Sequence, residues 1–221
     1  DISKIRTSAR KDKQLLSAEV VPVRQLKQLY NPNARISLEE INNQELLSDY
    51  ADSFEGLSTG DIQRFIKYFW EIALLDKSIW SFLIGSVNKS TFYGGKEQIL
   101  LWEEGKGEFV NFPGSYLKGM KAWGNHGIRI KLVYSKAATL YSGELFDKNA
   151  GTIIPFNPNF LLSIWTFCES TEFKVQVEKV NQNLYVPVKT LIQIPFNIEH
   201  WQKLAAKKYP HGLPQPYTND P

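Results

Sequence analysis

Residues 127–134 read GIRIKLVY, and this stretch decides the fold class of the 221-residue chain. Apolar Ile128 and Ile130 alternate with basic Arg129 and Lys131, a period of two that is typical of a β-strand with one apolar face. The opposite face would be basic and wetter. The stretch therefore predicts a strand that supports the core on one side and offers positive charge on the other.

Further short β-prone runs lie around this strand, each bounded by Gly, Asn or Pro. They are IWSFLIG at 79–85, QILLWEE at 98–104, ATLYSG at 138–143 and GTIIPF at 151–156. Helical spacing follows at 157–169, 171–180 and 197–208. We therefore predict an α+β fold in which helices flank a mixed or antiparallel central sheet, with a helical lead-in and a helical C-terminal part.

The residues before the strands are predicted to be helical. Residues 13–30 have helical apolar spacing, interrupted by Pro22, which should break or kink the helix. The sequence SLEE at 37–40 fits a capping box, in which Ser37 bonds forward and Glu40 reaches back. A second helix of this lead-in should therefore begin at Leu38.

The chain begins without Met and stops at Pro221 directly after a polar run, so we expect a piece of a longer polypeptide. We divide it into a helical lead-in or linker over residues 1–50 and a main domain over residues 51–221. Within the main domain, the part from about residue 157 could form a helical subdomain.

Composition excludes several classes of protein. With 43% hydrophobic residues the chain can bury a core, and no run approaches the roughly 20 apolar residues of a membrane helix, so we expect no membrane partner. One cysteine and three histidines give no zinc spacing and no internal disulfide, which fits a reducing cytoplasm. Cys168 shares a helical face with Leu161, Leu162 and Trp165, which predicts a small core residue and not a nucleophile.

The sequence GLSTGDIQRF at 56–65 is a glycine-bracketed loop, and the apolar spacing over 62–70 predicts a helix docked on a core. The loop lacks the lysine of a nucleotide phosphate-binding loop, and Asp61 stands where that lysine would help. Two interpretations remain: Asp61 caps the start of the helix, or the loop contacts a DNA phosphate. The candidate residues for a phosphate contact are Ser58, Thr59, Gly60 and Arg64.

Charge is unevenly placed along the chain, although the net charge is only +3. Seven acidic residues and no Lys or Arg lie between residues 39 and 61, whereas residues 109–143 hold five basic residues and no acid. Glycines, amides and an aromatic accompany the basic stretch, which favours a nucleic-acid-binding surface. The DNA-binding candidates there are Tyr93, Lys96, Lys118, Lys121, Trp123, Asn125, Arg129 and Lys131. The alternative is that Trp123 belongs to the core and the lysines are ordinary solubilising charge.

Several stretches, taken in their order and spacing, resemble one known family. They include LSDYADSFEGLSTGDIQRFIKYFWE at 47–71, FYGGKEQILLWEEG at 92–105, AWGNHGIRI at 122–130, SGELFDKNAGTIIPFNP at 142–158, LLSIWTFCES at 161–170 and the final residues 186–221. Together they cover most of the chain after about residue 14. The chain resembles the TaqI-like C-terminal specificity region of bacterial restriction-modification adenine methylases of the type IIG kind.

The resemblance implies that this chain is a DNA target-recognition module and not itself an enzyme. Its parent would be an S-adenosylmethionine-dependent, adenine-specific DNA methyltransferase of the bacterial cytoplasm, in a family that includes endonucleases. The cofactor would belong to a catalytic domain absent from this chain, so no cofactor is expected here. The implied partners are double-stranded DNA and the methyltransferase domain of the same polypeptide.

Within such a module, Arg129 and Lys131 would contact phosphate or guanine, and the 56–61 loop would hold a phosphate at the start of the Arg64 helix. Residues 157–160 read NPNF, which departs at the third position from the Asn-Pro-Pro-aromatic motif of adenine-methylating enzymes. We therefore interpret NPNF as a turn followed by a helix cap.

Two other classes of protein remain open. One is a structural scaffold of the same parent, which would present an apolar face to the catalytic domain and would not bind DNA alone. The other is a carbohydrate- or peptide-binding β module, which the six Trp and ten Tyr residues would suit.

Overall fold

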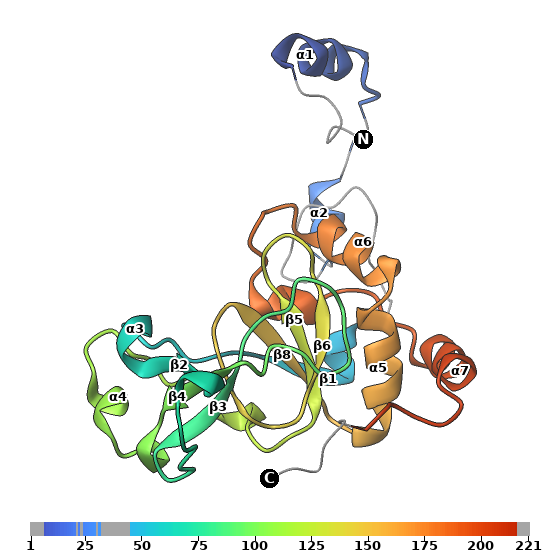
Figure 1. Ribbon diagram of the computed structural model, residues 1–221. Helices are drawn as coiled ribbons and strands as arrows, with labels where there is room; N and C mark the ends of the chain where they lie inside the picture. Colours follow the sequence, from blue (N-terminus) through green and yellow to red (C-terminus); the bar gives the residue numbers. More distant parts are fainter. Residues whose placement is uncertain (1–6, 21, 23, 30, 32–44, 216–221) are drawn as a thin grey trace. The chain divides into compact units, whose positions relative to one another are not determined.

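The computed structural model describes residues 7–20, 22, 24–29, 31 and 45–215 (Figure 1). The chain separates into two compact units, Asp1–Asn42 and Asn43–Pro221. In the first unit, α1 (Ser8–Ser17) and α2 (Gln25–Gln28) come before and after Pro22 in the sequence. The break at Pro22 is therefore confirmed, because proline removes a backbone donor and clashes with the preceding turn.

The first sheet of the second unit, termed sheet 1, is antiparallel with the strand order β1-β8-β5-β6. Its strands are β1 (Ala51–Glu55), β8 (Ala150–Pro155), β5 (Gly127–Lys131) and β6 (Ala138–Tyr141). Ile128 of β5 pairs with Ile153 on one side and Leu140 on the other, which extends an apolar face across the sheet.

The second sheet, termed sheet 2, is mixed and has the strand order β2-β4-β3-β7. Its strands are β2 (Ile66–Tyr68), β4 (Gln98–Leu101), β3 (Trp80–Ile84) and β7 (Leu145–Phe146), of which β7 runs parallel to β3. The α+β class with mixed or antiparallel strands is therefore confirmed. The strands form two sheets and not one central sheet, and the chain passes from β7 of sheet 2 to β8 of sheet 1.

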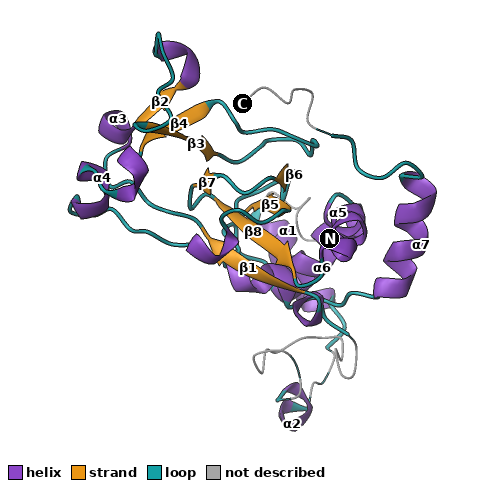
Figure 2. Ribbon diagram, turned by 90° about the horizontal axis from the view of Figure 1, so that it is seen from below, coloured by secondary structure: helices purple, strands orange, loops and turns teal. Residues whose placement is uncertain are grey.

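Helices cover one face of sheet 1 (Figures 1 and 2). They are α5 (Leu161–Cys168), α6 (Thr171–Val180) and η8 (Val188–Ile192), with α7 (Ile198–Lys208) packed on α5. The predicted C-terminal helices are confirmed, and so is the burial of Cys168. The side chain of Asn157 accepts a hydrogen bond from the Asn159 N–H at 3.0 Å, so NPNF is the turn and cap that we predicted.

The remaining helical elements are short. They are η3 (Leu47–Asp49), α3 (Ile62–Phe65), η4 (Phe69–Glu71), η5 (Glu103–Gly105), α4 (Glu108–Asn111), η6 (Met120–Ala122) and η7 (Pro158–Phe160). The helix predicted from Leu38 lies outside the described residues. Across the described ranges, no helix is both long enough and apolar enough to cross a bilayer.

The long helix predicted over residues 62–70 is wrong. The helix α3 ends at Phe65, and the chain continues as strand β2 and the turn η4. Phe65 is buried, but Ile62 and Trp70 are exposed. Ile66 pairs with Leu100 of β4, so a ladder with a strand far along the chain replaces further helical hydrogen bonds. β-branched and aromatic residues favour that choice.

The basic, wetter face predicted for β5 is also wrong. Arg129 is fully buried, because a second layer of chain covers this side of sheet 1. On that side the Arg129 guanidinium lies 5.0 Å from the centre of the Phe146 ring and forms an ion pair with Asp147. The alternation of side chains was predicted correctly, but it does not reveal that both faces are covered.

Candidate nucleic-acid interface

The chain crosses between the two sheets four times, and two of these crossings line a pocket of about 490 Å³. One crossing is the loop 56–61 after β1, and the other is the turn 147–149 between β7 and β8. We term this hollow the junction pocket. Its polar lining comprises Ser58, Thr59, Gln98, Tyr116, Asp147, Lys148 and Asn149, over an apolar floor that includes Ile62 and Ile66.

Backbone hydrogen bonds hold the loop 56–61 rigidly against the turn and a neighbouring loop. The Leu57 N–H donates to Phe146 O at 2.9 Å, and the Lys148 N–H donates to Leu57 O at 3.0 Å. Ser58 and Tyr116 exchange two backbone bonds, at 3.0 and 2.8 Å. Gly56 is needed here because a Cβ at this position would lie 2.2 Å from the carbonyl oxygen of Asp147.

Asp61 occupies the helix start that follows this loop. Its Oδ1 accepts a hydrogen bond from the Arg64 N–H at 3.1 Å, which confirms the capping interpretation. A phosphate at that end of α3 would meet the Asp61 carboxylate, which disfavours the phosphate site predicted at the Arg64 helix start. Arg64 itself forms an ion pair with Glu108, and its guanidinium lies 5.3 Å from the centre of the Phe112 ring.

A buried ion pair supports the turn at the edge of the junction pocket. Arg129 Nη2 donates to Asp147 Oδ1 at 2.7 Å, and Nη1 donates to Thr152 Oγ1 at 3.3 Å. Burial lowers the pKa of Arg129, whereas the Asp147 carboxylate acts in the opposite direction. Asn149 Nδ2 donates to the second oxygen of Asp147 at 2.6 Å. Arg129 therefore positions the turn from inside the protein and does not face a ligand.

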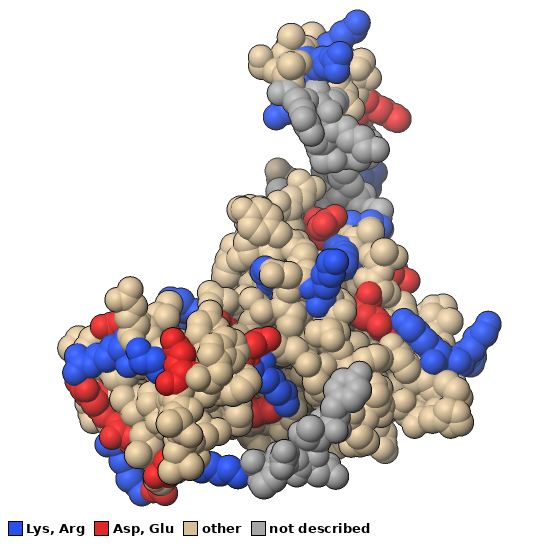
Figure 3. Space-filling view, in the orientation of Figure 1, with Lys and Arg blue, Asp and Glu red and all other residues tan. Residues whose placement is uncertain are grey.

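Three other predicted cations are engaged by side chains from distant parts of the sequence. Lys118 Nζ lies 2.8 Å from Glu55 Oε2, which raises the pKa of Lys118 through the hydrogen bond and the charge of that carboxylate. Lys96 Nζ lies 2.6 Å from Glu144 Oε1. Acidic and basic residues that are separated along the sequence are therefore neighbours in the folded chain. Figure 3 shows acidic and basic side chains next to one another over the part that holds sheet 2.

The third of these cations, Lys131, donates to Asn88 Oδ1 at 2.6 Å and has no acidic partner in the described chain. Lys121 and Lys148 are exposed, and neither ammonium forms an ion pair with a described residue. Lys148 lies in the junction pocket, but Lys121 belongs to η6 and does not line it. The structure thus brings Ser58, Thr59 and Gly60 together with Lys148, and it leaves Lys118 and Lys121 elsewhere.

The remaining candidates hold the fold together. The Tyr93 hydroxyl donates to Pro214 O at 2.9 Å, and burial raises the pKa of Tyr93. Trp123 is half-buried and stands edge-on to Trp102 with 5.6 Å between ring centres, so the core alternative is confirmed for this residue. Asn125 Nδ2 donates to the backbone oxygens of Lys121 and Trp123, at 3.1 and 3.2 Å.

Lys148 and Asn149 are pocket residues that the sequence analysis missed. They lie in the short Asp-Lys-Asn turn between two β-prone runs, inside one of the stretches that carry the family resemblance. A polar turn between two strands could have indicated these residues. A single lysine is not distinctive, however, in a chain with 26 basic residues.

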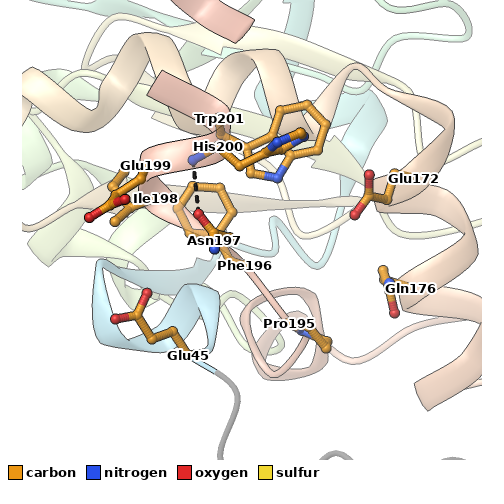
Figure 4. Close-up of a pocket in the computed structure, with 10 residues that line it drawn as sticks. All are labelled: Glu45, Glu172, Gln176, Pro195, Phe196, Asn197, Ile198, Glu199, His200 and Trp201. Carbon is orange, nitrogen blue, oxygen red and sulfur yellow. Dashed lines mark hydrogen bonds between the residues drawn. The ribbon is translucent and has the colours of Figure 1, made fainter. Parts of the chain in front are cut away.

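A second pocket, of about 650 Å³, has the opposite electrostatic character (Figure 4). Carboxylates from three separate elements, Glu45, Glu172 and Glu199, surround a floor that contains Phe196 and Trp201. Such a pocket repels a polyanion. Among the described residues, no group of His, Cys, Asp and Glu has the arrangement of a metal site.

Comparisons with known proteins give a single kind of likeness. No protein-family model matches the chain, and no curated protein matches it. Among solved structures, the chain is similar to the crystal structure of the HsdS subunit from Thermoanaerobacter tengcongensis, at 12% identity and a TM-score of 0.39. The match covers 90% of this chain and 43% of that chain, so the chain spans less than half the length of that subunit.

Proposed function

We propose that this chain is the DNA target-recognition module of a restriction-modification adenine methyltransferase, and that it positions duplex DNA for methylation by a catalytic domain of the same parent. The sequence resemblance supports the family. DNA binding by this chain is proposed from the turn of Lys148 and Asn149 at the rim of the junction pocket. The buried Arg129–Asp147 pair holds this turn in place.

The side chains on this turn have the chemistry that DNA recognition uses. Lys148 supplies an ammonium for a phosphate or for a guanine edge. Asn149 donates one N–H to Asp147, which fixes its amide plane and leaves its carbonyl oxygen and second N–H for a base edge. Ser58, across the pocket, adds a hydroxyl that can serve either partner. Rigid support matters because base readout depends on placing these groups within a fraction of an ångström.

Methyl transfer and the S-adenosylmethionine that it consumes belong, in this proposal, to the catalytic domain of the parent. The adenine would be rotated out of the duplex into that domain while the present module holds the flanking DNA. The parent would act in the bacterial cytoplasm.

The test is fluorescence anisotropy of the purified chain with a mixed-sequence DNA duplex, titrated from low to physiological salt. Lys148→Ala should weaken binding several-fold and reduce the salt slope by about one, because one phosphate contact is lost. Lys203→Ala is the matched control, since Lys203 is an exposed lysine on α7, away from the junction pocket. It should bind as the wild type does.

Two results would contradict the proposal. Equal effects of the two lysine substitutions would place the DNA elsewhere on the surface. Absence of binding by the wild-type chain, even at low salt, would favour the structural scaffold.

A carbohydrate- or peptide-binding module remains the second candidate, because the structure exposes an aromatic stack at Tyr68 and Trp70. Such a module would bind a neutral ligand with an affinity that changes little with salt, which separates it from a phosphate-binding surface.

A further inference from the structure

Exposed apolar side chains concentrate on one short part of the second unit, next to sheet 2. Between residues 62 and 82, the exposed large hydrophobic residues are Ile62, Tyr68, Phe69, Trp70, Leu74, Ile79 and Phe82. At the centre of the group, 60% of Trp70 is exposed, with 44% of Tyr68 and 46% of Phe69. Apolar patches of this kind mark interaction sites in folded proteins. We term Tyr68, Phe69 and Trp70 the aromatic tip.

The rings of the aromatic tip are arranged before any partner arrives. Tyr68 and Trp70 are stacked with 4.7 Å between ring centres and 12° between planes, and Phe69 meets Trp70 edge-on at 5.0 Å. The backbone beneath them is held, because the Tyr68 N–H donates to Glu71 Oε2 at 2.7 Å and the Phe69 N–H donates to Glu97 O at 3.1 Å. Figure 2 shows the helical turn after β2 at the outer end of sheet 2.

The aromatic tip is continuous with the junction pocket. Tyr68 pairs with Gln98 across β2 and β4, and Gln98 lines the pocket. Ile66 also lines the pocket, and it lies on the same face of β2 as Tyr68 because side chains alternate along a strand. A duplex that contacts Lys148 at the rim would therefore extend toward the tip.

The charges around the tip are compatible with a phosphate backbone. Lys67 donates to Gln63 O at 3.0 Å, and neither Lys67 nor Lys77 forms an ion pair within the described part of the chain. The neighbouring carboxylates Glu71 and Asp76 keep their negative charge but are held by local hydrogen bonds from Tyr68 and Ser78, so Lys67 and Lys77 supply the positive charge for a phosphate.

We infer that the aromatic tip is a wedge for DNA bases, with Trp70 stacking on a base, or between two bases, of the duplex that the junction pocket holds. This inference rests on the proposed function and deepens it. Apolar side chains inserted at a base step unstack it locally and kink the duplex, and a flat aromatic face accepts any base. The tip would then distort the DNA beside the turn that reads it, and selectivity would include how easily a base step opens.

The experiment uses the full chain and a duplex with 2-aminopurine at successive positions, because the emission of this base rises when it is unstacked. The wild type should raise the emission at one position. Trp70→Ala should abolish that rise and weaken binding about tenfold, the order expected for one lost base–aromatic stack. The salt slope should stay unchanged, because no phosphate contact is removed. Trp70→Phe keeps a ring and should retain most of the signal, while a matching circular dichroism spectrum checks the fold of both variants.

The outcomes separate this inference from the proposed function. If the wild type binds DNA and Trp70→Ala binds equally well with the same emission, the wedge is wrong and the recognition role stands. If the wild type binds no DNA at low salt, both are overturned. If Trp70→Ala leaves DNA binding intact but abolishes a concentration-dependent dimer in sedimentation velocity, the occupant of the patch is a second copy of the chain and the wedge is again wrong.

Discussion

Replacing Arg129 by Met tests the buried ion pair that holds the turn 147–149 in place. Met keeps most of the aliphatic length, so packing is largely preserved while the guanidinium is lost. Its charge-assisted bond to Asp147, at 2.7 Å, is worth about 1.5–3 kcal/mol, and its bond to Thr152, at 3.3 Å, about 0.5–1.5 kcal/mol. Part of this loss is offset because no guanidinium then has to be desolvated.

The loss of stability depends on which residue of the Arg129–Asp147 pair remains in the variant. The Asp147 side chain is 16% exposed and keeps the hydrogen bond from Asn149, so Arg129→Met should lower the free energy of unfolding by about 2–3 kcal/mol. Asp147→Asn leaves a guanidinium that is 0% exposed without its counter-charge, and this should cost about 3–5 kcal/mol. The double variant removes both charges and should cost no more than the worse single variant.

The assay is urea unfolding followed by tryptophan fluorescence for the wild type, both single variants and the double variant. The cycle should give a coupling free energy of at least about 2 kcal/mol. Additive losses, or a loss below about 1 kcal/mol for Arg129→Met, would refute the buried pair.

Two further predictions concern the same unit. Gly56→Ala should lower the free energy of unfolding by about 1–3 kcal/mol in the same urea assay, because the new Cβ would lie 2.2 Å from a backbone oxygen. Gly85→Ala is the control, because a Cβ there would have its nearest neighbour at 3.8 Å. Equal effects of the two substitutions would contradict the close approach at Gly56. Burial raises the pKa of Cys168, so its thiol should resist a disulfide reagent at neutral pH in the native chain and react fully in denaturant, and rapid labelling of the native chain would show that α5 does not bury it.

Regular repetition was predictable from the sequence, and contacts between distant segments were not. The period of two at Ile128 and Ile130 and the helical spacing after residue 157 report local burial directly, so the strand β5 and the C-terminal helices were predicted correctly. Residues 62–70 satisfy a helical period equally well. Their conformation is decided by pairing with residues 98–100 of β4, which no local pattern reveals.

The candidate site shows the same division. The loop 56–61 was recognised from its glycines, and it does line the junction pocket. Arg129 was taken for a surface cation because its burial depends on Phe146 and Asp147, which come later in the sequence. Lys118 was counted as free positive charge, but its partner Glu55 lies on β1. Sequence shows which charges exist, and only the fold shows which of them neutralise one another.

The antiparallel pairing of β1 with β8 also fixes an order of events during synthesis. Ala51 pairs with Pro155, and every other strand of both sheets lies between these two strands in the sequence. At typical rates of translation, β1 leaves the ribosome on the order of ten seconds before its partner exists. Sheet 1 thus forms completely only after sheet 2 and the junction pocket have been synthesised, so a chain cut before Ala150 would carry β1 without its partner strand and open to aggregation.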